Sequence, residues 1–170
     1  MKKKTVAMLV VYIVVPLLFT FASGETMAYP SLKDFHAPYF DFGSAMSTKE
    51  ATDTTRTDFY VAQYSIVTPE NALKPENVID VYNSSKAAKS DQGSVALHFN
   101  AAKPLLEFAM ANGLKVNGHV LFWHQQTPDT FFRVDYLRSE PYVSRDVLLA
   151  RMENYVRLMM AYLNEHYPGL

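Results

Sequence analysis

Apolar and polar residues recur along the chain in segments that predict strands and helices in alternation. Short apolar stretches that end in polar residues predict strands at residues 40–46, 65–68 and 115–124. Apolar residues at helical spacing predict helices at residues 54–64, 100–111 and 144–167. Alternation of this kind is typical of right-handed βαβ units, in which parallel strands form a sheet with helices on the outside.

The last of these helices has the most regular pattern. Ser144 can cap it, and Asp146 lies favourably in its first turn. One apolar stripe consists of Leu148, Met152, Tyr155, Val156, Met159 and Leu163. The residues expected away from this stripe are Arg151, Glu153, Asn154 and Arg157. The pattern therefore predicts an amphipathic helix that packs one face against a core.

The segment before the middle helix is less regular. Its composition shifts to Asn, Ser, Lys, Asp and Gly, which predicts a loop with a short helix near residues 75–82 and an exposed tip at residues 84–94. Asn100 is a candidate cap for the helix that follows, and Gly113 is expected to end that helix in a left-handed turn.

Three strand–helix units are too few to close a parallel barrel, which typically needs eight units and about 250 residues. Three parallel strands also leave much of a sheet without cover. The last helix is followed by Pro168 and Gly169, where a fourth strand is expected to begin. Two interpretations remain, a small open α/β protein and a truncated larger fold, and the pattern favours truncation.

The first 28 residues have the pattern of a secretory signal peptide. Three lysines precede an apolar run at residues 6–22, which small residues follow. The alternative is a membrane anchor, because the run approaches the roughly 20 residues that span a bilayer. Pro16 and the small residues favour cleavage, expected after Ala22, Gly24 or Ala28. The mature protein is then secreted and free of the membrane.

Composition excludes several other classes of protein. The chain has no cysteine, which rules out disulfides and thiolate metal sites. A formal net charge of −1 without a basic stripe argues against nucleic acid as a partner. A hydrophobic content of 49%, with 14% aromatic residues, fits a globular core.

The first candidate site is the polar end of the third predicted strand, residues 118–128, which read G-H-V-L-F-W-H-Q-Q-T-P. Strand alternation is expected to place His119, Leu121 and Trp123 on one side. An indole offers a flat platform for sugar rings, and His119 and Gln126 can hydrogen-bond hydroxyl groups. The simpler alternative is a core aromatic residue beside a buried, satisfied histidine.

The alternative interpretation of His119 and His124 is that they bind a metal ion. His119 and His124 are five residues apart and would point to opposite faces of a continuous strand. Neither H-x-H nor H-E-x-x-H occurs in the chain. No metal and no cofactor are therefore predicted.

The second candidate site follows the second predicted strand, where residues 69–76 read P-E-N-A-L-K-P-E. Glu70, Asn71 and Lys74 can form charge-assisted or amide hydrogen bonds to vicinal hydroxyls. The two prolines are expected to stiffen the loop and lower the cost of ordering it. The alternative is a solvated turn in which Glu76 and its neighbours form weak ion pairs.

These two motifs, in this order, resemble the loops after strands two and three of glycoside hydrolase family 10, the endo-xylanases. The similarity extends over residues 32–169 and includes F-F-R at residues 131–133. The resemblance implies a (β/α)8 barrel, of which residues 29–170 would be the N-terminal part, with about three βα units and a truncation before strand four. It also implies retaining hydrolysis of internal β-1,4-xylosidic bonds, with xylan or xylo-oligosaccharides as the partner of a monomeric enzyme.

The resemblance also assigns roles to residues. The expected ligands of the xylose on the far glycone side are Glu70, Asn71, Lys74 and Gln126. His119 and Trp123 would line the subsite next to the cleaved bond.

The catalytic pair is expected to be missing. A retaining glycosidase needs two carboxyl groups roughly 5–5.5 Å apart. In the family they follow strands four and seven, the first in an Asn-Glu pair, whereas the Asn-Glu pair after Gly118 is Asn164-Glu165 at the end of a predicted helix. Both glutamates are therefore expected beyond Leu170, which would leave this chain inactive.

Two rival interpretations remain from the sequence. One is a non-catalytic, secreted carbohydrate-binding protein that is complete at Leu170. The other is a barrel hydrolase that acts on a different polysaccharide, such as a glucan.

Overall fold

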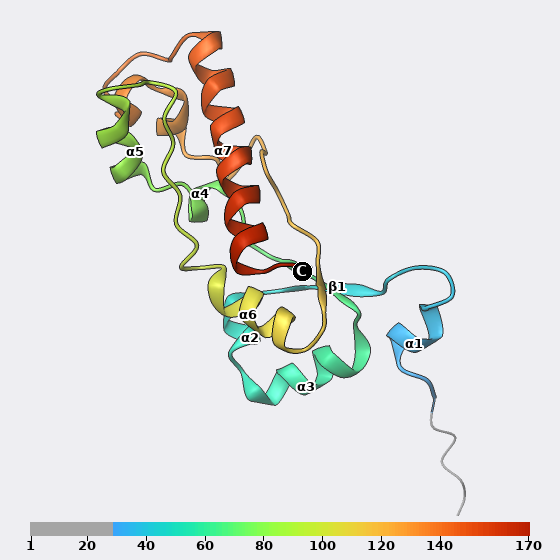
Figure 1. Ribbon diagram of the computed structural model, residues 1–170. Coiled ribbons are helices and arrows are strands. Elements are labelled where there is room, and N and C mark those ends of the chain that lie inside the picture. Colours follow the sequence, from blue (N-terminus) through green and yellow to red (C-terminus); the bar gives the residue numbers. More distant parts are fainter. Residues whose placement is uncertain (1–28) are drawn as a thin grey trace, which may run out of the picture.

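A computed structural model describes residues 29–170. The predicted signal peptide, residues 1–28, lies outside the described residues. The strands are β1 (Gly43–Met46), β2 (Ile66–Pro69) and β3 (Lys115–Val116) (Figure 1). The helices are α1 (Leu32–His36), α2 (Thr48–Ala51), α3 (Thr54–Gln63), α4 (Pro75–Val78), α5 (Val81–Ala88), α6 (Lys103–Ala111) and α7 (Arg145–His166), with 3-10 helices η1 (Asp129–Phe132) and η2 (Val134–Tyr136). No helix among these residues has the length and apolar character needed to cross a membrane.

The three strands form a parallel sheet in the order β1-β2-β3, which confirms the predicted βαβ organisation. Gly43 pairs with Ile66, and Ile66 pairs in turn with Lys115. Because the strands are parallel, their carboxyl ends lie at the same edge of the sheet. The residues that follow β1, β2 and β3 therefore meet at one edge, where ligand sites of parallel α/β folds are built.

β1 and β2 approach each other closely at Gly43. A Cβ atom on Gly43 would lie 2.5 Å from Cγ2 and 2.6 Å from the carbonyl oxygen of Ile66. Gly43→Ala is therefore expected to lower the free energy of unfolding by about 1–3 kcal/mol, measured by urea denaturation. Gly118→Ala is the matched control, since a Cβ there meets no atom within 4 Å. Equal stability of the two variants would contradict the close approach.

β3 is much shorter than the predicted strand at residues 115–124. Lys115 donates its N–H to the carbonyl of Ser65 and Asn117 donates to Val67, both at 2.9 Å. The next donor in this parallel ladder would be the N–H of residue 69, and Pro69 has none. The ladder stops there, and the chain from residue 117 to 128 follows an irregular path.

The segment before α6 also differs from the expectation. Residues 84–94 are not an exposed tip, because α5 enters this range and the side chain of Ser84 is fully buried. Its hydroxyl accepts a hydrogen bond from the N–H of Ala96 at 2.9 Å, so a polar residue is satisfied inside the fold. The predicted short helix near residues 75–82 is divided between α4 and α5.

The expected cap of α6 was wrong, whereas its end was predicted correctly. Asn100 lies in a turn, and the helix begins at Lys103 after Ala102, which makes no side-chain capping bond. Pro104 fits this first helical turn because its fixed φ suits the helix and no acceptor awaits its missing N–H. Gly113 has φ +64° and ends the helix as predicted.

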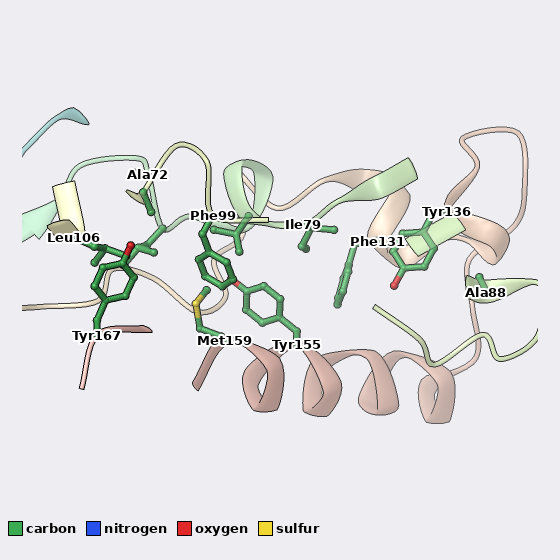
Figure 2. Packing of buried hydrophobic residues seen from close by; sticks show 13 residues of the cluster. Ala72, Ile79, Ala88, Phe99, Leu106, Phe131, Tyr136, Tyr155, Met159 and Tyr167 are labelled. Carbon is green, nitrogen blue, oxygen red and sulfur yellow. The ribbon is translucent and has the colours of Figure 1, made fainter. Parts of the chain in front are cut away.

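α7 supports the larger hydrophobic core. Ser144 caps it by accepting from the N–H of Val147, as predicted. Figure 2 shows Tyr155 and Met159 pointing from α7 toward Phe99 and neighbouring core residues, and both side chains are buried. The other members of the predicted stripe pack partly buried against the same cluster. The amphipathic prediction is confirmed.

Arg151 is the exception on α7, since it is fully buried instead of lying on the polar side. Its guanidinium donates to the carbonyls of Gln92, Phe131 and Arg133 at 2.7, 2.6 and 2.8 Å. It also donates to Oε1 of Gln92 at 3.0 Å and lies 3.9 Å from the ring centroid of Tyr136. Burial lowers the pKa of this guanidinium. The carbonyl groups replace the water that Arg151 loses on burial.

Candidate sugar-binding site

Two loops meet at the carboxyl edge of the sheet through Lys74. The β2–α4 loop supplies Asn71 and Lys74, and the irregular segment after β3 supplies Gln126. Nζ of Lys74 donates to Oδ1 of Asn71 at 2.9 Å and to Oε1 of Gln126 at 2.5 Å. The structure thus brings together three of the six residues expected to bind substrate.

The environment of Lys74 is unusual for a lysine. Its side chain is only 8% exposed, and its partners are two amide oxygens instead of a carboxylate. Nζ lies 5.1 Å from the ring centroid of Trp123, within reach of a cation–π contact. An ammonium group has three N–H donors, of which the protein takes two. One donor therefore remains for an oxygen atom of a ligand.

Trp123 and His119 are also neighbours. Their ring centroids are 6.5 Å apart, and the indole is 37% exposed. Strand alternation does not cause this arrangement, because residues 117–128 form no strand. The hydroxyl of Thr127 donates to the carbonyl of Trp123 at 2.9 Å and closes a turn there. The expected proximity holds, but through this irregular path.

Gln126 has the most constrained position in the site. Its φ is +53°, in the left-handed region that residues other than glycine rarely adopt. Its Nε2 donates to Oε1 of Glu76 at 2.7 Å and to Oδ1 of Asn71 at 3.2 Å. The backbone N–H of Glu76 donates to the carbonyl of Gln126 at 3.0 Å. Sequence reasoning left Glu76 out of the site, although it lies in the same motif two residues after Lys74.

Glu70 stands apart from this group. Its backbone N–H donates to the carbonyl of Met46 at 3.0 Å, which places it at the same edge of the sheet as Trp123. Its side chain lines a separate polar pocket of about 280 Å³. The other lining residues of that pocket are Ser47, Lys49, Glu50, Asp53 and Arg56. Glu70 thus belongs to the same edge but not to the hydrogen-bonded group around Lys74.

Across residues 29–170, no three His, Asp or Glu side chains gather in a way that could hold a metal ion. Asn164 and Glu165 lie within α7, as predicted, and not at the end of a strand.

The chain consists of parallel βα units that carry polar side chains at the carboxyl ends of their strands. Part of a (β/α)8-barrel glycoside hydrolase has this arrangement. The model of glycosyl hydrolase family 10 matches residues 31–168. The chain therefore belongs to glycosyl hydrolase family 10.

Named relatives agree with this placement. The chain is 34% identical over 140 residues to the bifunctional endo-1,4-beta-xylanase XylA of Ruminococcus flavefaciens, covering 82% of this chain and 14% of that protein. It is 35% identical over 140 residues to endo-1,4-beta-xylanase B of Butyrivibrio fibrisolvens, covering 82% of this chain and 22% of that protein. The chain thus spans less than a quarter of the length of either relative.

A solved structure resembles the described region closely. It contains the glycoside hydrolase module of endo-1,4-beta-D-xylanase 10B from Clostridium thermocellum in complex with xylohexaose. The TM-score is 0.77 at 29% identity, and the match covers 84% of this chain and 26% of that one.

Proposed function

We propose that this chain supplies the glycone-side binding surface of a retaining endo-β-1,4-xylanase. The observation that carries the proposal is the buried Lys74, held by Asn71 and Gln126 beside the indole of Trp123. A relative named as a xylanase and solved with xylohexaose supports xylan as the substrate class. The leader at residues 1–28 would direct secretion of a monomeric protein.

The chemistry of this surface suits a neutral sugar. Asn71 and Gln126 combine donors and acceptors that match vicinal hydroxyls, and Lys74 adds a charged donor that bonds more strongly than a neutral one. The face of Trp123 can stack on the apolar side of a sugar ring, and His119 lies beside it. The network is formed before the sugar arrives, which reduces the ordering cost of binding.

The cleavage step requires two carboxylates, which we propose lie outside these 170 residues. A protonated glutamate would donate its proton to the leaving oxygen while a second glutamate attacks the anomeric carbon. The placement of Asn164 and Glu165 inside α7 supports this proposal, because catalytic residues of such barrels lie at the carboxyl ends of strands.

A chimera tests the proposal. Residues 31–168 would replace the matching segment of the C. thermocellum xylanase, and reducing-sugar release from soluble xylan would be measured. We expect turnover by the chimera and none by the 170-residue chain alone. Far-UV circular dichroism would establish that both are folded.

Each contrary result has a distinct meaning. Hydrolysis by the 170-residue chain would refute the external catalytic pair. A folded chimera that cleaves cellulose but not xylan would favour the glucan interpretation. Saturable xylotriose binding by the chain, with a folded but inactive chimera, would favour a non-catalytic binding protein.

A further inference from the structure

We infer that Glu76 is a positioning residue that fixes both the backbone and the amide orientation of Gln126, and so decides which atoms of the site face the sugar. The inference rests on the proposed function only in that Gln126 is taken to bind substrate. Two separate bonds join these residues, which are 50 positions apart in the chain.

The first bond acts on the backbone. Gln126 adopts φ +53°, a conformation that costs a residue with a Cβ atom about 1–2 kcal/mol. Its carbonyl accepts the N–H of Glu76 at 3.0 Å. Glu76 lies in the first turn of α4, where backbone N–H groups have no acceptor within the helix. The bond therefore satisfies an otherwise unpaired donor and offsets the cost of the left-handed residue.

The second bond acts on the side chain. A carboxylate can only accept hydrogen bonds, so Oε1 of Glu76, 2.7 Å away, requires the NH2 group of Gln126 on its side. An ammonium can only donate, so Nζ of Lys74, 2.5 Å away, requires the amide oxygen on the other side. Rotating the amide by 180° would set oxygen against carboxylate and NH2 against ammonium. One orientation is therefore strongly favoured.

The effect of Glu76 reaches the ligand-facing groups through Gln126. Oε1 of Gln126 holds Nζ of Lys74, which lies 5.1 Å from the ring of Trp123. Oδ1 of Asn71 accepts from both Lys74 and Gln126. Without the carboxylate of Glu76, the NH2 group of Gln126 keeps only the longer bond to Oδ1 of Asn71 at 3.2 Å, so the amide is held firmly on the Lys74 side alone. The remaining donor of Lys74 then loses its fixed direction.

The test addresses the side-chain bond, because Ala or Gln at position 76 keeps the backbone N–H, and it separates positioning from direct sugar contact. Glu76→Ala and the conservative Glu76→Gln would be made in the 170-residue chain, together with Gln126→Ala and the double variant Glu76→Ala/Gln126→Ala. Xylotriose affinity would be titrated through the fluorescence of Trp123, the only tryptophan of the chain. Glu153→Ala, at an exposed position of α7, is the matched control and should leave affinity unchanged.

We expect Glu76→Ala to weaken xylotriose binding by about tenfold, the size of one lost hydrogen bond to a charged group. Glu76→Gln should recover most of this loss, since its side-chain oxygen can still accept from Gln126. In the Gln126→Ala background, Glu76→Ala should have less than about a twofold further effect. An undiminished loss in that background would overturn the inference, because Glu76 would then act on the sugar or the fold by another route.

A measurement without sugar distinguishes the positioning role of Glu76 from the proposed xylan-binding function. The side-chain NH2 resonances of Gln126 in a nitrogen–proton correlation spectrum should show slow exchange and two well-separated proton shifts. The amide C–N bond keeps the two NH2 protons distinct in any glutamine, so the readout is the size of each effect. Glu76→Ala should speed exchange with water and move both shifts toward those of a solvent-exposed glutamine, and unchanged NH2 resonances would refute positioning. A wild-type chain that has the resonances but does not bind xylotriose would contradict the proposed function alone.

Discussion

Replacing Arg151 by methionine is expected to lower the free energy of unfolding by about 3–5 kcal/mol, the largest effect we expect on stability, because several buried acceptors lose a donor at once. Methionine fills much of the space but donates no hydrogen bond. The carbonyls of Gln92, Phe131 and Arg133 would each lose their donor from Arg151 inside the fold. Because small domains are stabilised by only about 5–15 kcal/mol, this variant is expected to be close to unfolded at 37 °C.

Urea denaturation followed by circular dichroism and Trp123 emission would measure this loss. Arg157→Met on the same helix is the control, since Arg157 is exposed and should change stability by less than about 0.5 kcal/mol. A loss below about 1 kcal/mol in Arg151→Met would mean that water replaces the guanidinium without cost.

Lys74→Met is expected to weaken xylotriose binding by about 100-fold, because a charge-assisted donor is worth roughly 1.5–3 kcal/mol. The substitution retains most of the side-chain length beside Trp123 but leaves the oxygens of Asn71 and Gln126 without their shared donor. Isothermal titration calorimetry would measure the change. Lys103→Met, on the exposed side of α6, is the control. Affinity within twofold of the wild type would remove Lys74 from the site.

The sheet and the long helix could be predicted because their signals are local. Six apolar residues of α7 recur at helical spacing, and Ser144 marks its start. The meeting of Lys74 and Gln126 could also be predicted, since consecutive parallel strands end at one edge. Their role in binding xylan remains a prediction that the experiments above test.

Other features depend on partners far away in the chain. Arg151 and Ser84 are polar residue types that composition assigns to the surface, yet each meets backbone groups that only the folded chain brings near. The bond between Glu76 and Gln126 was missed for the same reason, because the two residues lie in separate loops. The motif itself contained a signal for including Glu76 in the site, because this carboxylate follows Lys74 by two positions.

The end of β3 shows how a partner strand can shape the neighbouring loop. Pro69 has no N–H to donate to the strand beside it, and the ladder hydrogen bonds between β2 and β3 end at Asn117. A residue with an N–H group at position 69 would offer one further ladder hydrogen bond to the backbone beside Asn117, at the start of the segment that carries Trp123 and Gln126. The shape of the recognition surface is thus encoded partly in a residue that belongs to the opposite strand.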